Sequence, residues 1–377
     1  MNLFQKKAVS LQTIALNTFT LYIGFTVWSV MFNNFAKEVF DISPTQLGII
    51  QSVRELPGLL GFMVGALALY LAEVKIATWS IVISGLGLLL LGHANSIWML
   101  GAGTLVMSLG FHNFLSANDA LMLHHVKTKE SAKVQGKIRS TESASSVITA
   151  ACVFVATLWL GYRQVWTIFG AVVVLTGIYL SCTLKSNREK EEERKFCYKR
   201  KYTLYYLLSF LRGCRRHFFS TFAIFLLVAN YHIHISVAAI LFFVSSLVTT
   251  YTYRVMGQVV EKWGERAVLA GSSFILIFIF SGYAFIHWLP LLIVFYIMDN
   301  VLFGSSIALD SYMRKISSQA DLTNCLSFSQ TANHISAVII PVLGGVIWQS
   351  FGYQSTFLFG AAIVFFDALL SLRVKIR

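Results

Sequence analysis

Three arginines lie on one face of an apolar stretch, residues 202–231, that is long enough to cross a membrane. Arg212, Arg215 and Arg216 are spaced i, i+3 and i+4. A guanidinium at bilayer depth costs about 2.5–3.5 kcal/mol on insertion scales, so such groups usually face a protein interior or a water-filled cavity. The planar fork of arginine suits carboxylate and phosphate. We therefore predict that this stripe contacts an anionic part of a cargo. Permanent pairing with internal acids, or a position at the cytosolic border, is the alternative.

Two buried carboxylates are candidates for exchanging partners or protons with such a site. Asp299 lies at mid-depth in an apolar stretch, where it could pair with the arginines until an anionic solute displaces it. It could also carry a coupling proton or form a fixed ion pair. Glu55, in the second apolar stretch, is another candidate for the coupling proton. Its neighbour Arg54 leaves the helix about 100° away, so we predict that the two do not pair with each other.

Polar residues on other apolar stretches could contact cargo or form gates. His112, Asn333 and His334 are predicted cargo contacts, with interior hydrogen bonding as the alternative. Asp119 and Asp310 lie near the cytosolic ends of their stretches, which favours charge pairs that close a gate.

The elements that carry these residues are predicted to be membrane helices. Hydrophobic residues make up 56% of the 377 residues and charged residues 12%, and the mean hydropathy is +0.68. This composition predicts an all-α polytopic membrane protein. We expect twelve transmembrane helices, at residues 12–34, 44–72, 76–94, 97–123, 139–161, 165–184, 203–230, 233–253, 266–286, 289–312, 323–349 and 354–372.

The chain is predicted to form two pseudo-symmetric six-helix bundles, residues 1–184 and 203–377, joined by a charged cytosolic linker at residues 185–202. The sequence LGYRQVWTIFGAVVV at residues 160–174 is similar to FGYQSTFLFGAAIVF at residues 351–365. Aligning these two segments also aligns Asp119 with Asp310. Parallel repeats of this kind are typical of transporters that rock two bundles about a central cavity.

Basic residues are distributed unevenly between the loops. With both termini in the cytosol, 24 of the 30 Lys and Arg residues lie in cytosolic loops and tails, and only Lys37 and Arg163 lie outside. This asymmetry follows the positive-inside rule and explains the net charge of +13 without a nucleic-acid partner. We expect an integral protein of a bacterial cytoplasmic (inner) membrane that acts as a monomer.

One loop carries a recognisable motif. In GQVVEKWGERAVL, residues 257–269, the order Gly257, Glu261, Gly264 and Arg266 resembles a loop of the major facilitator superfamily. The resemblance implies that family's fold and transport by alternating access. It also implies that this loop closes the cytosolic side, with a charge pair between its acid and its arginine. The corresponding loop of the first half departs from the motif, with Leu69 in place of the acid.

The sequence carries no recognisable signal for catalysis or metal binding. The five cysteines show no metal-binding spacing, and the sequence contains no GxxxxGK[ST], HExxH or GxSxG motif. We therefore expect no enzyme activity, no cofactor and no metal.

The sequence favours a secondary transporter, a symporter or antiporter that moves a small organic anion and is coupled to protons. One alternative is a proton-coupled exporter of hydrophobic or cationic compounds that uses Asp299 or Glu55 as its charge acceptor. Another is a membrane receptor that has the transporter fold but carries no flux.

Overall fold

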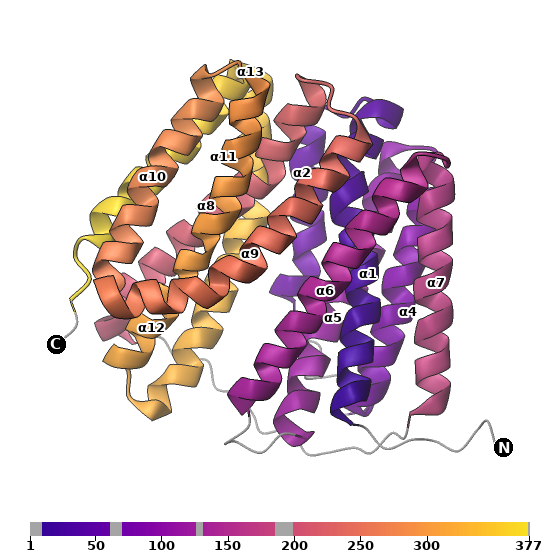
Figure 1. Cartoon of the computed structure of the whole chain (residues 1–377), viewed down its shortest axis with the longest axis horizontal. Coiled ribbons are helices and arrows are strands. Elements are labelled where there is room, and N and C mark those ends of the chain that lie inside the picture. Colours follow the sequence, from indigo (N-terminus) through magenta and orange to yellow (C-terminus); the bar gives the residue numbers. More distant parts are fainter. Residues whose placement is uncertain (1–9, 61–69, 126–130, 185–198, 376–377) are drawn as a thin grey trace. The chain divides into compact units, whose positions relative to one another are not determined.

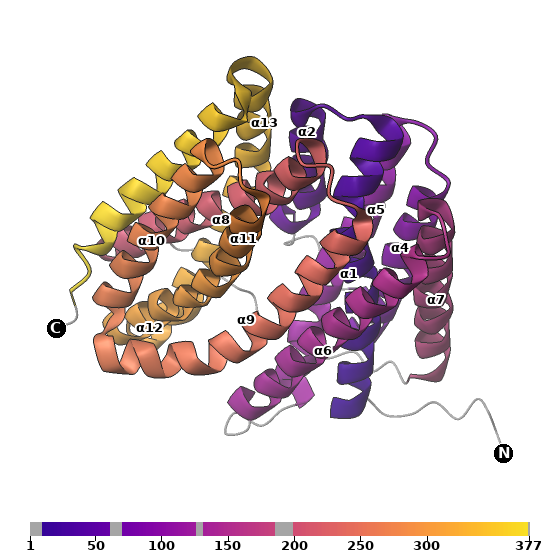
Figure 2. The same ribbon diagram turned by 45° about the horizontal axis from the view of Figure 1, so that its top comes forward.

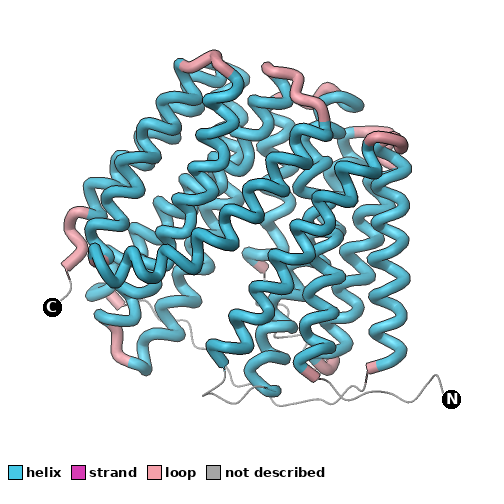
Figure 3. Tube along the Cα trace, viewed as in Figure 1, coloured by secondary structure: helices cyan, strands magenta, loops and turns pink. Residues whose placement is uncertain are grey.

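The structure is a computed structural model that describes residues 10–60, 70–125, 131–184 and 199–375 (Figure 1). The described chain consists of helices joined by short loops (Figure 3). It forms two compact units. Unit 1 comprises residues 1–41, 53–192 and 234–246, and unit 2 comprises residues 42–52, 193–233 and 247–377. The division into bundles at residues 1–184 and 203–377 stays a prediction.

Unit 1 is built mainly from five helices. These are α1 (Leu11–Phe40), α4 (Glu73–Gly92), α5 (Ile97–His125), α6 (Ser131–Thr157) and α7 (Tyr162–Thr183). The second part of α2 (Pro44–Leu59) and the first part of α9 (Ile235–Trp263) also belong to this unit.

Unit 2 is built around α8 (Thr203–Ala229), which packs against α13 (Gln319–Ser371). Its other helices are α10 (Glu265–Phe285), α11 (Leu289–Leu302) and α12 (Ser306–Ile316), with a 3₁₀ turn, η3 (Phe303–Ser305), between the last two. A second 3₁₀ turn, η2 (Arg200–Tyr202), precedes α8.

Each predicted span coincides with a helix, although residues 61–69 of the second lie outside the described residues. Two details differ from the prediction. The span expected at 289–312 is broken by η3, which contains Gly304. The last two spans are joined in α13 at Gly352, whose φ of 85° is readily adopted only by glycine. Within the described residues, seven helices are long and apolar enough to cross a membrane. The count of twelve crossings stays a prediction.

Glycines bring the helices of unit 1 close together. Helix α4 packs between α5 and α7 (Figure 2). A Cβ added at Gly87 would lie within 3.0 Å of backbone atoms of Met107, and one at Gly110 would meet the backbone of Ser80 and Ser84 as closely. Small residues at such crossings let the backbones approach, which is how membrane helices gain packing energy without a hydrophobic driving force.

Aromatic side chains fill the half of unit 2 towards the C-terminal end of α8. Phe218, Phe219 and Phe222 of α8 are buried. Phe218 and Phe219 contact Phe280 of α10, and Phe218 also contacts Phe357 of α13 and Phe222. Phe222 also contacts Trp348 of α13. Ring pairs of this kind add about 0.5–1.5 kcal/mol each beyond the area that they bury. They fix the rotation of α8 and therefore the direction in which its arginines point.

We predict that Gly87→Ala destabilises the protein, because the new methyl group must push the backbone of α5 away. Overpacking of this kind typically costs about 1–3 kcal/mol. The matched control is Gly271→Ala in α10, where a Cβ meets no atom within 4 Å. Melting of the detergent-purified protein, followed by tryptophan fluorescence, should show a lower midpoint for the first variant alone. Equal midpoints would contradict the close packing of α4 on α5.

Candidate functional site

The candidate site in unit 2 is a set of ionisable side chains that we call the arginine cluster. It consists of Arg212, Arg215 and Arg216 of α8 with Asp299 of α11 and Asp367 of α13. The three arginines come from one face of α8, as their spacing predicts, but each has a different environment.

Arg212 is held by hydrogen bonds on both sides of its fork. Its Nη1 donates to Ser305 Oγ at 2.9 Å, and its Nη2 donates to the carbonyl of Leu269 at 3.1 Å. The same Nη2 lies 3.3 Å from Asp367 Oδ2, which also accepts a 2.5 Å hydrogen bond from Ser273 Oγ. The Arg212 side chain is only 11% exposed. These contacts fit an arginine that ties α8 to α10 and α13, which is the pairing alternative raised by the sequence.

Asp367 belongs to the arginine cluster but was not predicted from the sequence. It is the single carboxylate within the apolar run AAIVFFDALL at residues 361–370. An acid at that depth requires an interior partner, so the apolar run around Asp367 was a signal that could have found it.

Arg215 and Asp299 form the second buried pair. Arg215 Nη1 lies 2.6 Å from Asp299 Oδ1, and the two side chains are 6% and 9% exposed. The sequence predicts that these two residues pair, either exchangeably or as a fixed ion pair, and the contact itself is present. A short contact between an arginine and a carboxylate is strong in a buried position; whether the pair exchanges stays a prediction.

Arg216 is exposed, although it lies at the middle of α8. Its Cζ is 4.5 Å from the ring centroid of Phe303, and Arg215 approaches the same ring at 5.8 Å. Phe303 is the first residue of η3. A 3₁₀ turn within a helix often marks a functional hinge, and this one places a single aromatic ring against two guanidinium groups.

A smaller charged group occurs in unit 1. Arg54 and Glu55 of α2 form an ion pair with each other, so the prediction that adjacent residues would not pair is wrong. Both side chains are long enough to bend towards each other across the 100° between their Cα–Cβ directions. His112 Nε2 of α5 lies 3.8 Å from Glu55 Oε2, and Arg54 Cζ lies 4.7 Å from the ring of Trp28 on α1.

The other predicted cargo contacts and gate residues lie on α5, α12 and α13. Asn333, on α13, faces α8, because a Cβ at Gly213 would lie 3.1 Å from its Oδ1. His334 is half-buried on the same helix. Asp119 and Asp310 have exposed side chains. The roles proposed for these residues stay predictions.

In the motif loop, Gly264 adopts a conformation that suits glycine, but the ion pair found there is not the expected one between Glu261 and Arg266. Gly264 has a φ of 79°, which glycine adopts without strain. Glu261 and Arg266 are exposed, and no ion pair joins them in the described part of the chain. Glu265 is instead buried, 2.5 Å from Lys315 Nζ, and accepts a 2.7 Å hydrogen bond from Ser311. Gly257 lies about one turn earlier than Glu261 on α9.

A third cluster fastens the start of α8 to the start of α13. Asp321 accepts hydrogen bonds from Lys199 at 2.5 Å, from Lys201 at 2.9 Å and from the Tyr202 hydroxyl at 2.9 Å. These bonds hold the pKa of the Asp321 carboxyl well below its usual range. A lowered pKa means that this carboxylate stabilises the fold at pH values above about 4 and loses its contribution only at lower pH.

No cluster of three or more metal-ligating side chains occurs among the described residues. What the described helices do hold is a set of oppositely charged pairs buried within long apolar segments. Such pairs suit the binding and conformational exchange of charged groups inside a membrane. That is the chemistry of a membrane transporter.

The chain belongs to the Major Facilitator Superfamily, whose sequence profile it matches over residues 14–309 and again over residues 204–376. No curated protein matches the chain by sequence. A solved structure of the nucleoside transporter NupG is similar, with a TM-score of 0.79 at 14% identity, covering 99% of this chain and 99% of that one. A bacterial homologue of the human lysosomal transporter Spinster, inward-facing and unoccupied, has a TM-score of 0.79 at 14% identity, covering 97% of this chain and 96% of that one. The human organic anion transporter MFSD10 (TETRAN) has a TM-score of 0.63 at 12% identity, covering 96% of this chain and 98% of that one. At these identities the similarity concerns the fold alone.

We predict that Arg212 and Asp367 act as a structural pair. Asp367→Leu should destabilise the protein by about 3–5 kcal/mol, because it leaves a buried guanidinium without its carboxylate. The double variant Arg212→Met/Asp367→Leu should recover most of the lost thermal stability and retain transport. The measurement is the melting midpoint of each purified variant, followed by solute flux. If the double variant melts below Asp367→Leu, or folds but carries no solute, the assignment fails.

Proposed function

We propose that this chain is a secondary active transporter that moves a small organic anion across a cytoplasmic membrane by alternating access, coupled to protons. Both termini would lie in the cytosol, in keeping with the distribution of its basic residues. The fold and the family support transport of a small solute; the anion and the coupling are the parts that we propose.

The observation that carries the proposal is the position of Arg216. Its side chain is exposed at the middle of a 27-residue apolar helix, a depth at which contact with acyl chains would be costly. An aqueous route past this face of α8 would remove that cost. Arg216 and Phe303 would then offer a solute a guanidinium and an apolar ring side by side, which suits an organic anion with a hydrophobic or planar body.

The Arg215–Asp299 pair supplies a mechanism for exchange. A carboxylate or phosphate that binds Arg216 would lie next to a guanidinium already matched to a carboxylate. The solute could replace Asp299 as the partner of Arg215, and Asp299 would then take up a proton, because a buried carboxylate without a partner is destabilised. Solute binding and proton binding would thereby be linked.

The competing proposal, an exporter of hydrophobic cations, has less support. It requires a carboxylate that can accept a positive charge, and its two candidates, Asp299 and Glu55, are each paired with an arginine. The structural neighbours do not decide between cargoes, since they include both a nucleoside transporter and an organic anion transporter.

We expect Arg216→Gln to raise the KM for the transported anion by at least about tenfold, because a charge-assisted hydrogen bond contributes about 1.5–3 kcal/mol. The anion is first found by a thermal-shift screen of phosphorylated and carboxylated metabolites, since a ligand of the folded state raises its melting temperature. Uptake into proteoliposomes then gives KM, with the exposed Arg373→Gln, just after α13, as the control. An unchanged KM for Arg216→Gln, or an equal rise in the control, would rule out the anion site.

Proton coupling is expected to depend on Asp299. Asp299→Asn should abolish accumulation driven by an imposed pH gradient and leave counterflow of preloaded solute, because exchange needs no net proton movement. Asp299→Glu controls for the loss of the ion pair. Continued accumulation in Asp299→Asn would exclude this residue, and loss in Glu55→Gln instead would assign coupling to unit 1. Absence of counterflow with every anion tested would instead favour the alternative of a membrane receptor that has the transporter fold but moves no solute.

A further inference from the structure

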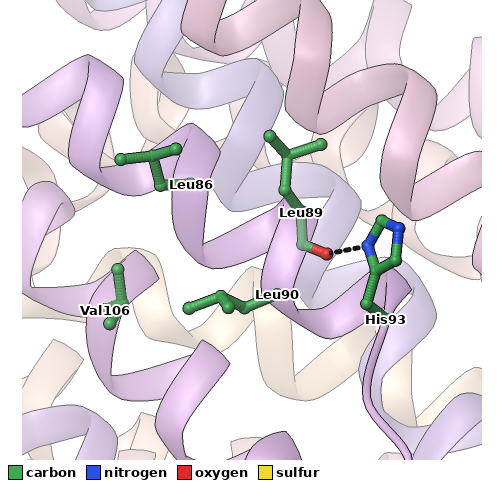
Figure 4. Close-up of a pocket in the computed structure, with 5 residues that line it drawn as sticks. All are labelled: Leu86, Leu89, Leu90, His93 and Val106. Carbon is green, nitrogen blue, oxygen red and sulfur yellow. Dashed lines mark hydrogen bonds between the residues drawn. The ribbon is translucent and has the colours of Figure 1, made fainter.

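Two open crevices that share His93 lie on the surface of unit 1. The first has a volume of about 380 Å³ and is lined by Leu86, Leu89 and Leu90 of α4 and by Val106 of α5, with His93 at its end (Figure 4). The second, of about 530 Å³, lies between α4 and α7 and shares His93 with the first. Both volumes are in the range of small-molecule sites, about 300–1,000 Å³.

The surroundings of these crevices are those of a lipid contact. Leu86 and Leu90 are exposed on α4, and Ile168, Val172 and Leu175 are exposed on α7. Apolar side chains exposed on the outside of a membrane helix contact acyl chains. The indoles of Trp98 and Trp159 are 89% and 84% exposed close to the same helix ends, and tryptophan is enriched where acyl chains meet headgroups.

The second crevice is polar at the membrane surface. Arg163 and Gln164 of α7 line it together with His93. Arg163 is one of only two basic residues on the predicted outer side. The other, Lys37, is paired with Asp41, whereas Arg163 has no acidic partner among the described residues. Gln164 accepts the N–H of Gly161 at 3.0 Å through Oε1, which leaves its amide NH₂ as a donor. Arg163 and Gln164 can therefore donate together to an anionic oxygen.

His93 contributes the opposite kind of group. Its Nδ1 lies 2.8 Å from the carbonyl oxygen of Leu89, and since a carbonyl only accepts, Nδ1 carries the proton. In the neutral ring Nε2 is therefore an acceptor, and it points away from Leu89 (Figure 4). The site thus combines a cationic donor, a hydrogen-bond acceptor and an apolar channel.

From this combination we propose that the crevices between α4, α5 and α7 bind one phospholipid whose headgroup carries both a phosphate and an N–H or O–H donor. The phosphodiester binds Arg163 and Gln164, the headgroup donor binds His93 Nε2, and an acyl chain fills the crevice of Leu86, Leu90 and Val106. Phosphatidylethanolamine and phosphatidylglycerol share this chemistry. Phosphatidylcholine has the phosphate but lacks the donor. The proposal is independent of the transported solute.

The test is native mass spectrometry of the full-length protein in detergent, titrated with the three lipids at matched acyl chains. We expect phosphatidylethanolamine or phosphatidylglycerol to bind about fivefold more tightly than phosphatidylcholine, the value of one ordinary hydrogen bond. Arg163→Gln should weaken binding of all three by at least about tenfold. His93→Phe should remove the preference and leave phosphatidylcholine binding unchanged.

Two further arms test whether binding requires the acyl chains of the lipid. Leu90→Trp should block the apolar crevice and weaken binding, and glycerophosphoethanolamine, which has no acyl chains, should fail to compete with the lipid. Lys37→Gln is the matched control, and melting midpoints show that each variant is folded. Equal binding of the three lipids, an Arg163→Gln variant that binds like the control, or full competition by the soluble headgroup would overturn the proposal.

Discussion

A buried guanidinium paired with a buried carboxylate is the interaction on which unit 2 depends. Removing either charge from water costs several kcal/mol, and only a close partner of opposite sign offsets that cost. The cation of each pair differs with its position along the helices. Asp367 and Asp299, inside the helices, are paired with arginines. Glu265 and Asp321, at the helix ends, are paired with half-exposed lysines. This order follows from hydration, because the compact ammonium group holds water more tightly than the guanidinium does.

The apolar packing of α8 makes these pairs specific. Phe218 and Phe219 fix the helix against α10, and the Asp321 cluster fixes the neighbourhood of its first turn. Between these two anchors, Arg212 and Arg215 each contact a carboxylate. Arg212 is bonded to α10 and α13, whereas Arg215 and Arg216 lie beside the ring of Phe303. One periodic stripe in the sequence is thus divided into parts with different surroundings.

The sequence predicted the helices and the arginine face well, because apolar length and i, i+3, i+4 spacing are local properties. Partners were predicted less well. Asp367 lies far from Arg212 along the chain, and no spacing rule connects them. The Arg54–Glu55 pair was excluded by considering only the directions in which side chains leave a helix, although both are long enough to bend. The break at η3 was missed because a glycine such as Gly304 is common in membrane helices.

The 3₁₀ turn has a consequence for how solute recognition and motion are related. Phe303 belongs to the segment where α11 ends and α12 begins, and its ring covers two of the three arginines. A change in the angle between these helices would slide the ring off both cations at once. Exposing the two guanidinium groups and bending the helix would then be a single event, because both depend on the position of one phenyl ring.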